Sequence, residues 1–129
     1  MSTDLQVTVR DDHEDLVVVA VAGALDFRTI ATLRERATDA ATGHRHLVLD
    51  MSRVTFCDSS GLNTLLRLLR HVRDNGATLT LTGVPAQTKR LLAITGADAV
   101  FTIRDNLSEV LESLGGTEHR RQPPPAPTA

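Results

Sequence analysis

An acid, two hydroxyls and a glycine stand together near the middle of the chain, in the run Asp58-Ser59-Ser60-Gly61. An apolar stretch ends just before this run, and a leucine-rich helical pattern begins just after it. Asp, Ser and Gly are common at helix starts, where a capping side chain contributes about 1 kcal/mol. The first turn of a helix also has amides without partners, and these favour negative charge. The run therefore allows two interpretations: a helix cap alone, or a serine that receives an anionic group.

A nucleophilic serine on a sharp strand-to-helix turn is a third interpretation. The pattern G-x-S-x-G that such an elbow requires is absent, because Phe56 or Cys57 stands where its first glycine belongs. None of the five histidines has an evident orienting carboxylate in the sequence: His13, His44, His46, His71 and His119. A serine hydrolase therefore remains only a formal alternative.

Composition limits the other classes of function. A chain of 129 residues is long enough for one domain. The formal net charge is -2 and the basic residues are scattered, so there is no electrostatic case for direct binding of nucleic acid. Tyr and Trp are absent and Phe occurs three times, which weakens any interpretation that needs aromatic platforms for single-stranded nucleic acid.

The single cysteine, Cys57, excludes an intramolecular disulfide and a cysteine-based zinc site, and we expect no metal. The N-terminus lacks the basic region and apolar core of a secretory signal. The longest apolar run, residues 16–25, is about half as long as a membrane span. We therefore expect a soluble cytoplasmic protein without membrane insertion.

Strands and helices alternate along the chain. Apolar alternation and β-branched runs predict strands over residues 5–9, 16–21, 46–52, 78–83 and 100–103. Helical periodicity predicts helices over residues 28–42, 60–74, 85–95 and 108–114. Gly23 is expected to end the second strand, and Asp26 to cap the first helix.

This alternation predicts an α/β fold, with a mixed, largely parallel sheet of four to five strands and about four helices packed on it. We expect the domain to occupy residues 1–114. The remainder, residues 115–129, is rich in Gly and Pro and poor in apolar residues, which predicts a disordered tail.

The stretch VLDMSRVTFCDSSGLNTLL closely resembles the signature of the STAS domain, the family of bacterial anti-sigma factor antagonists. The likeness extends upstream to VAGALDFRTIATLRE and downstream to GATLTLTGVPAQTKRLLAITGADAVFTI. It covers residues 5–114, and its order of elements agrees with the predicted one. The resemblance implies a STAS-type sheet and helices.

The resemblance also implies a function, that of a binding regulator, for which we expect no enzymatic activity, no catalytic residue and no cofactor. Antagonists of this family bind an anti-sigma factor that is also a serine kinase, and binding releases a sigma factor. The kinase phosphorylates the first serine of the motif, here Ser59, and a serine phosphatase acting on phospho-Ser59 restores the free form. Asp58 is then important for phosphorylation and binding, while Ser60 and Gly61 shape the turn and the helix start.

Three further residues are candidates for the partner surface. Asn63 and Arg67 follow Ser59 at helical spacing, and a solvated helix face is the alternative interpretation for both. Asp26 belongs to a turn that lies near the serine site in the family. STAS domains also serve as adaptor subunits of stressosome-like complexes or of membrane lipid transporters, and both roles remain alternatives for this chain.

Overall fold

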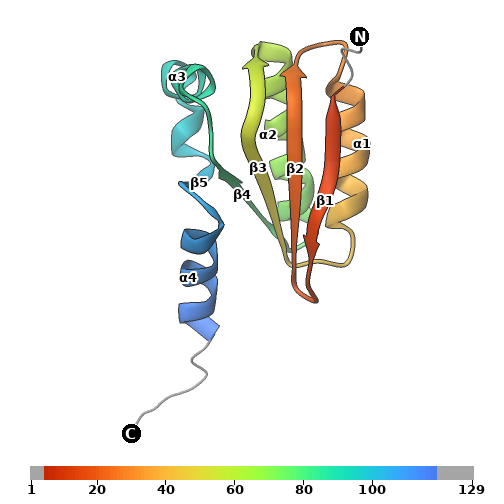
Figure 1. Ribbon diagram of the computed structural model, residues 1–129, viewed down its shortest axis with the longest axis vertical. Helices are drawn as coiled ribbons and strands as arrows, with labels where there is room; N and C mark the ends of the chain where they lie inside the picture. Colours follow the sequence, from red (N-terminus) through yellow and green to blue (C-terminus); the bar gives the residue numbers. More distant parts are fainter. Residues whose placement is uncertain (1–4, 119–129) are drawn as a thin grey trace, which may run out of the picture.

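A five-stranded sheet organises the molecule (Figure 1). The computed structural model describes residues 5–118. The strands follow one another across the sheet in chain order: β1 (Gln6–Asp12), β2 (Leu16–Leu25), β3 (His46–Cys57), β4 (Thr78–Thr82) and β5 (Thr102–Arg104). β1 is antiparallel to β2, and every other neighbouring pair is parallel. The predicted mixed, largely parallel sheet is confirmed.

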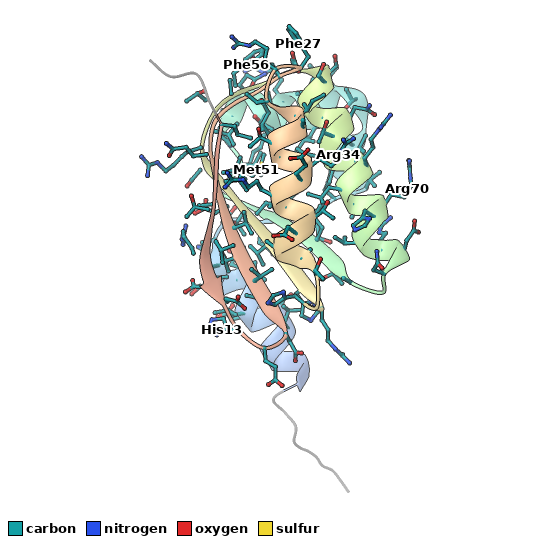
Figure 2. The ribbon with its side chains drawn as sticks, turned by 90° about the vertical axis from the view of Figure 1, so that its right-hand side faces the viewer. His13, Phe27, Arg34, Met51, Phe56 and Arg70 are labelled. Atoms are coloured by element: carbon teal, nitrogen blue, oxygen red, sulfur yellow. The ribbon has the colours of Figure 1, made fainter. Side chains whose placement is uncertain are left out.

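Helices connect the parallel strands, as parallel pairing requires. The connecting helices are α1 (Ile30–Ala41), α2 (Ser59–Asp74) and α3 (Ala86–Thr95), the last followed by a short 3-10 turn, η1 (Ala97–Ala99). A fourth helix, α4 (Leu107–Glu118), follows β5. In Figure 2, α1 and α2 lie side by side along one face of the sheet. The α/β class and the expected set of about four helices are confirmed.

The two faces of the sheet bury different side chains of the same strands. Val19 and Leu49 point into the main core, where they meet Leu33 of α1 and Leu65 of α2. The alternate residues of β2 and β3 form a smaller second core with α4, made of Leu16, Val18, Val48 and Val110. Because successive side chains of a strand point to opposite faces, a central strand covered on both sides is apolar throughout. This explains why residues 16–21 form a continuous apolar run.

β1 is an edge strand, and its alternation is only partly reflected in burial. Leu5 and Val7 are buried, but the side chain of Val9 is 49% exposed. A register shift between Val9 and Asp11 bends the strand away from its regular pairing with β2. The predicted strand is present, although its third apolar residue does not reach the core.

β2 and β3 are both longer than predicted, and Gly23 does not end β2. Gly23 has φ 117 and still pairs with Val54, and the register then shifts before Ala24. A glycine adopts this backbone conformation without steric cost, so the irregularity is absorbed and the pairing continues. The two strands consequently run on together as far as Leu25 and Cys57.

The prediction that Asp26 caps a helix starting at residue 28 is wrong. Its carboxylate accepts a hydrogen bond from the Arg28 amide at 2.9 Å, and its backbone carbonyl accepts from the amides of Thr29 and Ile30. These bonds form a separate turn, after which α1 begins at Ile30 with Thr29 as its N-cap. Asp26 therefore stabilises the turn between β2 and α1 instead of the helix itself.

The last helix differs from its predicted bounds at its C-terminal end. α4 extends to Glu118, beyond the boundary predicted at Leu114. Val110 is buried against the second face of the sheet, and Leu107 and Leu114 pack around it. Residues 119–129, which make up most of the predicted disordered tail, lie outside the described residues.

Candidate functional site

The serine joint lies where two neighbouring parallel strands end at the same edge of the sheet (Figure 1). Leu25, the last residue of β2, pairs with Cys57, the last residue of β3. The Asp58 amide then donates a hydrogen bond to the Leu25 carbonyl at 3.2 Å. The carboxyl edge of a parallel sheet is where α/β folds usually place their sites, and this backbone bond joins the two strand ends there.

Asp58 caps α2 with its side chain. One carboxylate oxygen, Oδ1, accepts from the amides of Ser60 at 2.9 Å and Gly61 at 3.1 Å. The Asp58 carbonyl accepts from the Leu62 amide at 2.9 Å, which starts the regular helical bonding. The capping role predicted for this motif is therefore present, and the helix begins at Ser59.

Ser59 is exposed at the first position of α2. Among residues 5–118, no hydrogen bond involves its hydroxyl, so the oxygen is free to react or to contact a partner. The nearest helix amides are less available than the sequence suggests, because Asp58 already accepts from those of Ser60 and Gly61. An anionic group on Ser59 would consequently stand beside a carboxylate and project into solvent.

Gly61 is required by a close approach between backbones. A Cβ at this position would lie 2.6 Å from the Leu25 carbonyl oxygen and 2.7 Å from the Leu25 Cβ. It would also lie 3.0 Å from the Cys57 sulfur. The absence of a side chain thus lets the first turn of α2 pack directly on the ends of β2 and β3.

Gln87 of α3 holds the last residue of β3 from the other side. Its Oε1 accepts from the Cys57 amide at 3.0 Å, and its Nε2 donates to the Cys57 carbonyl at 2.9 Å. The pairing of β3 with β4 ends at Asp50 and Thr82, so Cys57 has no partner in β4. The side-chain amide replaces that missing strand partner. Sequence reasoning missed Gln87, because no local pattern signals a contact between residues this far apart.

The Cys57 thiol is buried and unreactive. Burial, followed by the negative charge of Asp58, raises the pKa of Cys57 to about 11. The thiol therefore stays protonated at neutral pH, and the reactive thiolate is scarce. This agrees with the interpretation of Cys57 as a small core residue, whose sulfur lies close to Gly61.

Two adjoining hollows lie on the surface around Ser59. The first is bordered by Ser59, Ser60, Leu62, Asn63 and Leu66. The second runs between α1 and α2 and includes Phe27, Arg34, Asn63 and Arg67. Asn63 borders both, so the hollows adjoin each other along the first turns of α2. Of the predicted partner residues, Asn63 and Arg67 thus lie on one exposed surface with Ser59.

Two exposed aromatic rings flank this surface. Phe27 is 74% exposed and Phe56 is 45% exposed. Figure 2 shows both at the same end of the molecule, where α2 begins. Neither was singled out from the sequence, where one lies in a polar turn and the other in an apolar run.

Asp26 borders neither hollow. It follows Leu25, so its turn adjoins the joint, but its carboxylate pairs with the Arg28 guanidinium at 3.2 Å. Hydrogen bonds from the Arg28 side chain and amide lower the pKa of Asp26. Of the seven predicted residues, Asp26 is therefore the one whose side chain is already engaged away from Ser59.

Histidine and acidic side chains form no catalytic or metal-binding group around the site in the described residues. Within residues 5–118, no histidine hydrogen-bonds to either serine of the joint. No cluster of three or more His, Cys, Asp or Glu side chains in this part of the chain could hold a metal ion. None of the helices described is both long and apolar enough to cross a membrane.

Comparison with protein families and curated proteins gives a consistent result. The family model described as the STAS domain matches residues 4–110. An anti-sigma F factor antagonist of Paenibacillus polymyxa is 27% identical over 113 residues, which cover 86% of this chain and 96% of that protein. An anti-sigma-B factor antagonist of Staphylococcus aureus is 30% identical over 106 residues, which cover 81% of this chain and 95% of that protein.

A solved structure is similar over the same region. The crystal structure of an anti-sigma factor antagonist from Mycobacterium paratuberculosis superposes with a TM-score of 0.74 at 26% identity. The match covers 84% of this chain and 92% of that one. The fold and nearly the whole length of the relative are therefore shared.

The close approach at Gly61 generates a first prediction. Gly61→Ala should destabilise the fold by about 1 to 3 kcal/mol, because the new methyl group overlaps the Leu25 backbone. Helix propensity alone would stabilise the Ala variant by about 1 kcal/mol, so the two effects oppose each other. The sign of the change in unfolding free energy shows which effect is larger. Urea unfolding measures the difference. Ser60→Ala is the control and should change stability by less than about 0.5 kcal/mol; a Gly61→Ala protein as stable as wild type would refute the close packing.

The two hydrogen bonds between the Gln87 side chain and Cys57 generate a second prediction. Gln87→Glu keeps the shape of the side chain but removes the donor to the Cys57 carbonyl, so it should cost about 0.5 to 1.5 kcal/mol. Exchange of the Cys57 amide with solvent, followed by NMR, should become several-fold faster, because the new carboxylate repels the Cys57 carbonyl oxygen and is displaced from the Cys57 amide. Gln6→Glu, at an exposed position in β1, is the matched control. Unchanged exchange at Cys57 would show that Gln87 does not hold the joint.

Proposed function

Because the chain belongs to the STAS domain family, we propose that it acts as an anti-sigma factor antagonist. In this role it is a binding regulator and not an enzyme. It binds an anti-sigma factor that is also a serine kinase, and binding frees the sigma factor. The names of the curated relatives and of the similar solved structure support the antagonist role. The kinase and sigma-releasing steps rest on the family resemblance of the motif, and we propose that they take place in the cytoplasm.

The switch is phosphorylation of Ser59. The observation that carries this proposal is the geometry of the residue: an exposed hydroxyl without a hydrogen bond, at the first position of a helix that Asp58 already caps. A kinase reaches such a hydroxyl without unfolding the joint. Ser60 is half-buried, which makes it the poorer acceptor.

The phosphate acts through charge at a surface. It adds about -1.5 to -2 charge at neutral pH. The group stands beside the Asp58 carboxylate, and the amides of Ser60 and Gly61 are already bonded to that carboxylate. When a partner covers this surface, the phosphate must lose its hydration without gaining those donors, which costs several kcal/mol. Phosphorylation therefore releases the partner, and a serine phosphatase restores the binding form.

The remaining predicted residues have roles around this switch. Gly61 and Asp58 position Ser59, whereas Asn63 and Arg67 extend the contact surface along α2. Ser60 contributes its amide to the cap. Asp26 fixes the neighbouring turn through its bonds to Arg28, so it supports the surface more than it contacts the partner.

Binding of two Ser59 variants to the kinase partner tests the proposal. Ser59→Ala removes little volume and no hydrogen bond, so it should bind as wild type does and accept no phosphate in the presence of ATP. Ser59→Asp should bind at least about tenfold more weakly, a loss of about 1.4 kcal/mol, because it places an unpaired charge in the interface. Calorimetry against the same nucleotide-loaded kinase measures both. Equal affinities for the two variants would mean that charge at residue 59 does not gate binding.

The adaptor roles predict a different partner. Pull-down with the wild-type chain, followed by mass spectrometry, distinguishes them: a serine kinase of the anti-sigma factor type supports the antagonist role. Recovery of transporter subunits or of a stressosome-like assembly in its place would contradict it.

A further inference from the structure

The groove between α1 and α2 is lined in part by residues that have no role in the Ser59 switch. Phe27 stands at its mouth, and Ile30 and Arg34 form the side that belongs to α1. Asn63 and Arg67 form the side that belongs to α2. The groove thus combines an aromatic ring with two guanidinium groups.

Both arginines are available to a ligand. Arg34 and Arg67 are exposed, and neither makes a hydrogen bond or an ion pair with any residue of the described part of the chain. Arg34 also borders a hollow lined by Glu35 and Asp39, but no ion pair joins it to either carboxylate within residues 5–118. The formal net charge of the chain is -2, so the pair is a local positive feature of a slightly acidic protein.

The apolar side chains of the groove are also at least partly exposed to solvent. Phe27 is 74% exposed, although transfer of an aromatic ring out of water is favourable. Ile30 is half-buried beside it. Exposed aromatic rings next to arginines are typical of the energetically important centres of protein interfaces.

The groove adjoins the Ser59 surface. Asn63 borders both the groove and the hollow that contains Ser59. A protein bound over Ser59 therefore reaches the groove by following α2 for its next two turns. The arginine pair lies on that path.

We propose that this groove docks a segment of the anti-sigma factor kinase that carries one or more carboxylates next to an apolar side chain. The apolar side chain packs on Phe27 and Ile30, and the carboxylates pair with Arg34 and Arg67. Guanidinium groups bind carboxylates through two parallel hydrogen bonds, which gives this contact direction as well as strength. The inference rests on the proposed function, and it adds the residues and the partner chemistry that select one kinase.

The test uses charge reversal on the two helices. The anti-sigma factor kinases encoded in the same genome are purified, and the one that binds the wild-type chain is titrated with each variant by calorimetry. Arg34→Glu combined with Arg67→Glu should weaken binding at least about tenfold, because it sets carboxylates against carboxylates. Arg36→Glu combined with Arg70→Glu makes the same charge change on the same helices outside the groove, and it should change affinity less than about twofold. Figure 2 labels Arg34 and Arg70 on these two helices.

A second pair of variants tests the apolar contact. Phe27→Ser should weaken binding at least about fivefold, as expected for an aromatic anchor in an interface. Ile94→Ser is the matched control, because Ile94 is 76% exposed on α3 and lies outside both hollows. Raising the salt from about 0.1 M to about 1 M should weaken binding of the wild type more than that of the double groove variant, since salt screens the lost contacts.

The outcomes separate this inference from the proposed function. If Ser59→Asp lowers affinity but the groove variants bind as wild type does, the groove inference is wrong and the switch stands. If no such kinase binds, both are overturned. If the groove variants weaken binding but charge at residue 59 does not, the switch is wrong and the groove inference stands. Dissociation of a dimer by the groove variants, with kinase binding unchanged, would assign the groove to a second copy of the chain and overturn the inference.

Discussion

The contact between the backbone of Leu25 and the first turn of α2 is the constraint on which the site depends. The Leu25 carbonyl accepts the Asp58 amide, and the same oxygen lies where only a glycine fits at position 61. Two parallel strands and a helix start are thereby joined at one point, with no side chain between them. Core packing at Leu65 and Leu68 then fixes the direction in which α2 leaves the sheet. Ser59 is presented by this arrangement and takes little part in it.

The different roles of Asp58 and Ser59 follow from the hydrogen bonds that the helix start requires. A helix start has amides that need acceptors, and Asp58 supplies one acceptor oxygen for two of them. The serine beside it is consequently not needed as a cap. A side chain that makes no structural hydrogen bond can gain and lose a phosphate without altering the fold. The same hydrogen bonds leave a phosphate on Ser59 without nearby donors, because Asp58 already occupies them. A partner that covers Ser59 would therefore meet an unpaired charge.

Much of this arrangement could be predicted from the sequence, for physical reasons that differ from element to element. The leucine stripe of α2 and the β-branched run of β2 report burial directly, so both elements were predicted within a few residues. The end of β2 was not, because Gly23 is a strand breaker in one context and a bulge in another, and only the pairing with Val54 decides. Asp26 is a plausible cap by type, but its bonds to Arg28 depend on the local turn. Gln87 and Phe27 owe their importance to tertiary neighbours, which no local pattern encodes.

The central claim is that phosphorylation changes the surface at Ser59 and leaves the platform beneath it intact. Amide hydrogen exchange on the fully phosphorylated chain, compared with the free chain, tests this most directly. The account predicts the same protection in β2, β3 and the middle of α2, with changes confined to the joint around residues 57–63. Loss of protection through α2, or at the paired ends of β2 and β3, would show that the phosphate acts by unfolding the joint and would contradict the account.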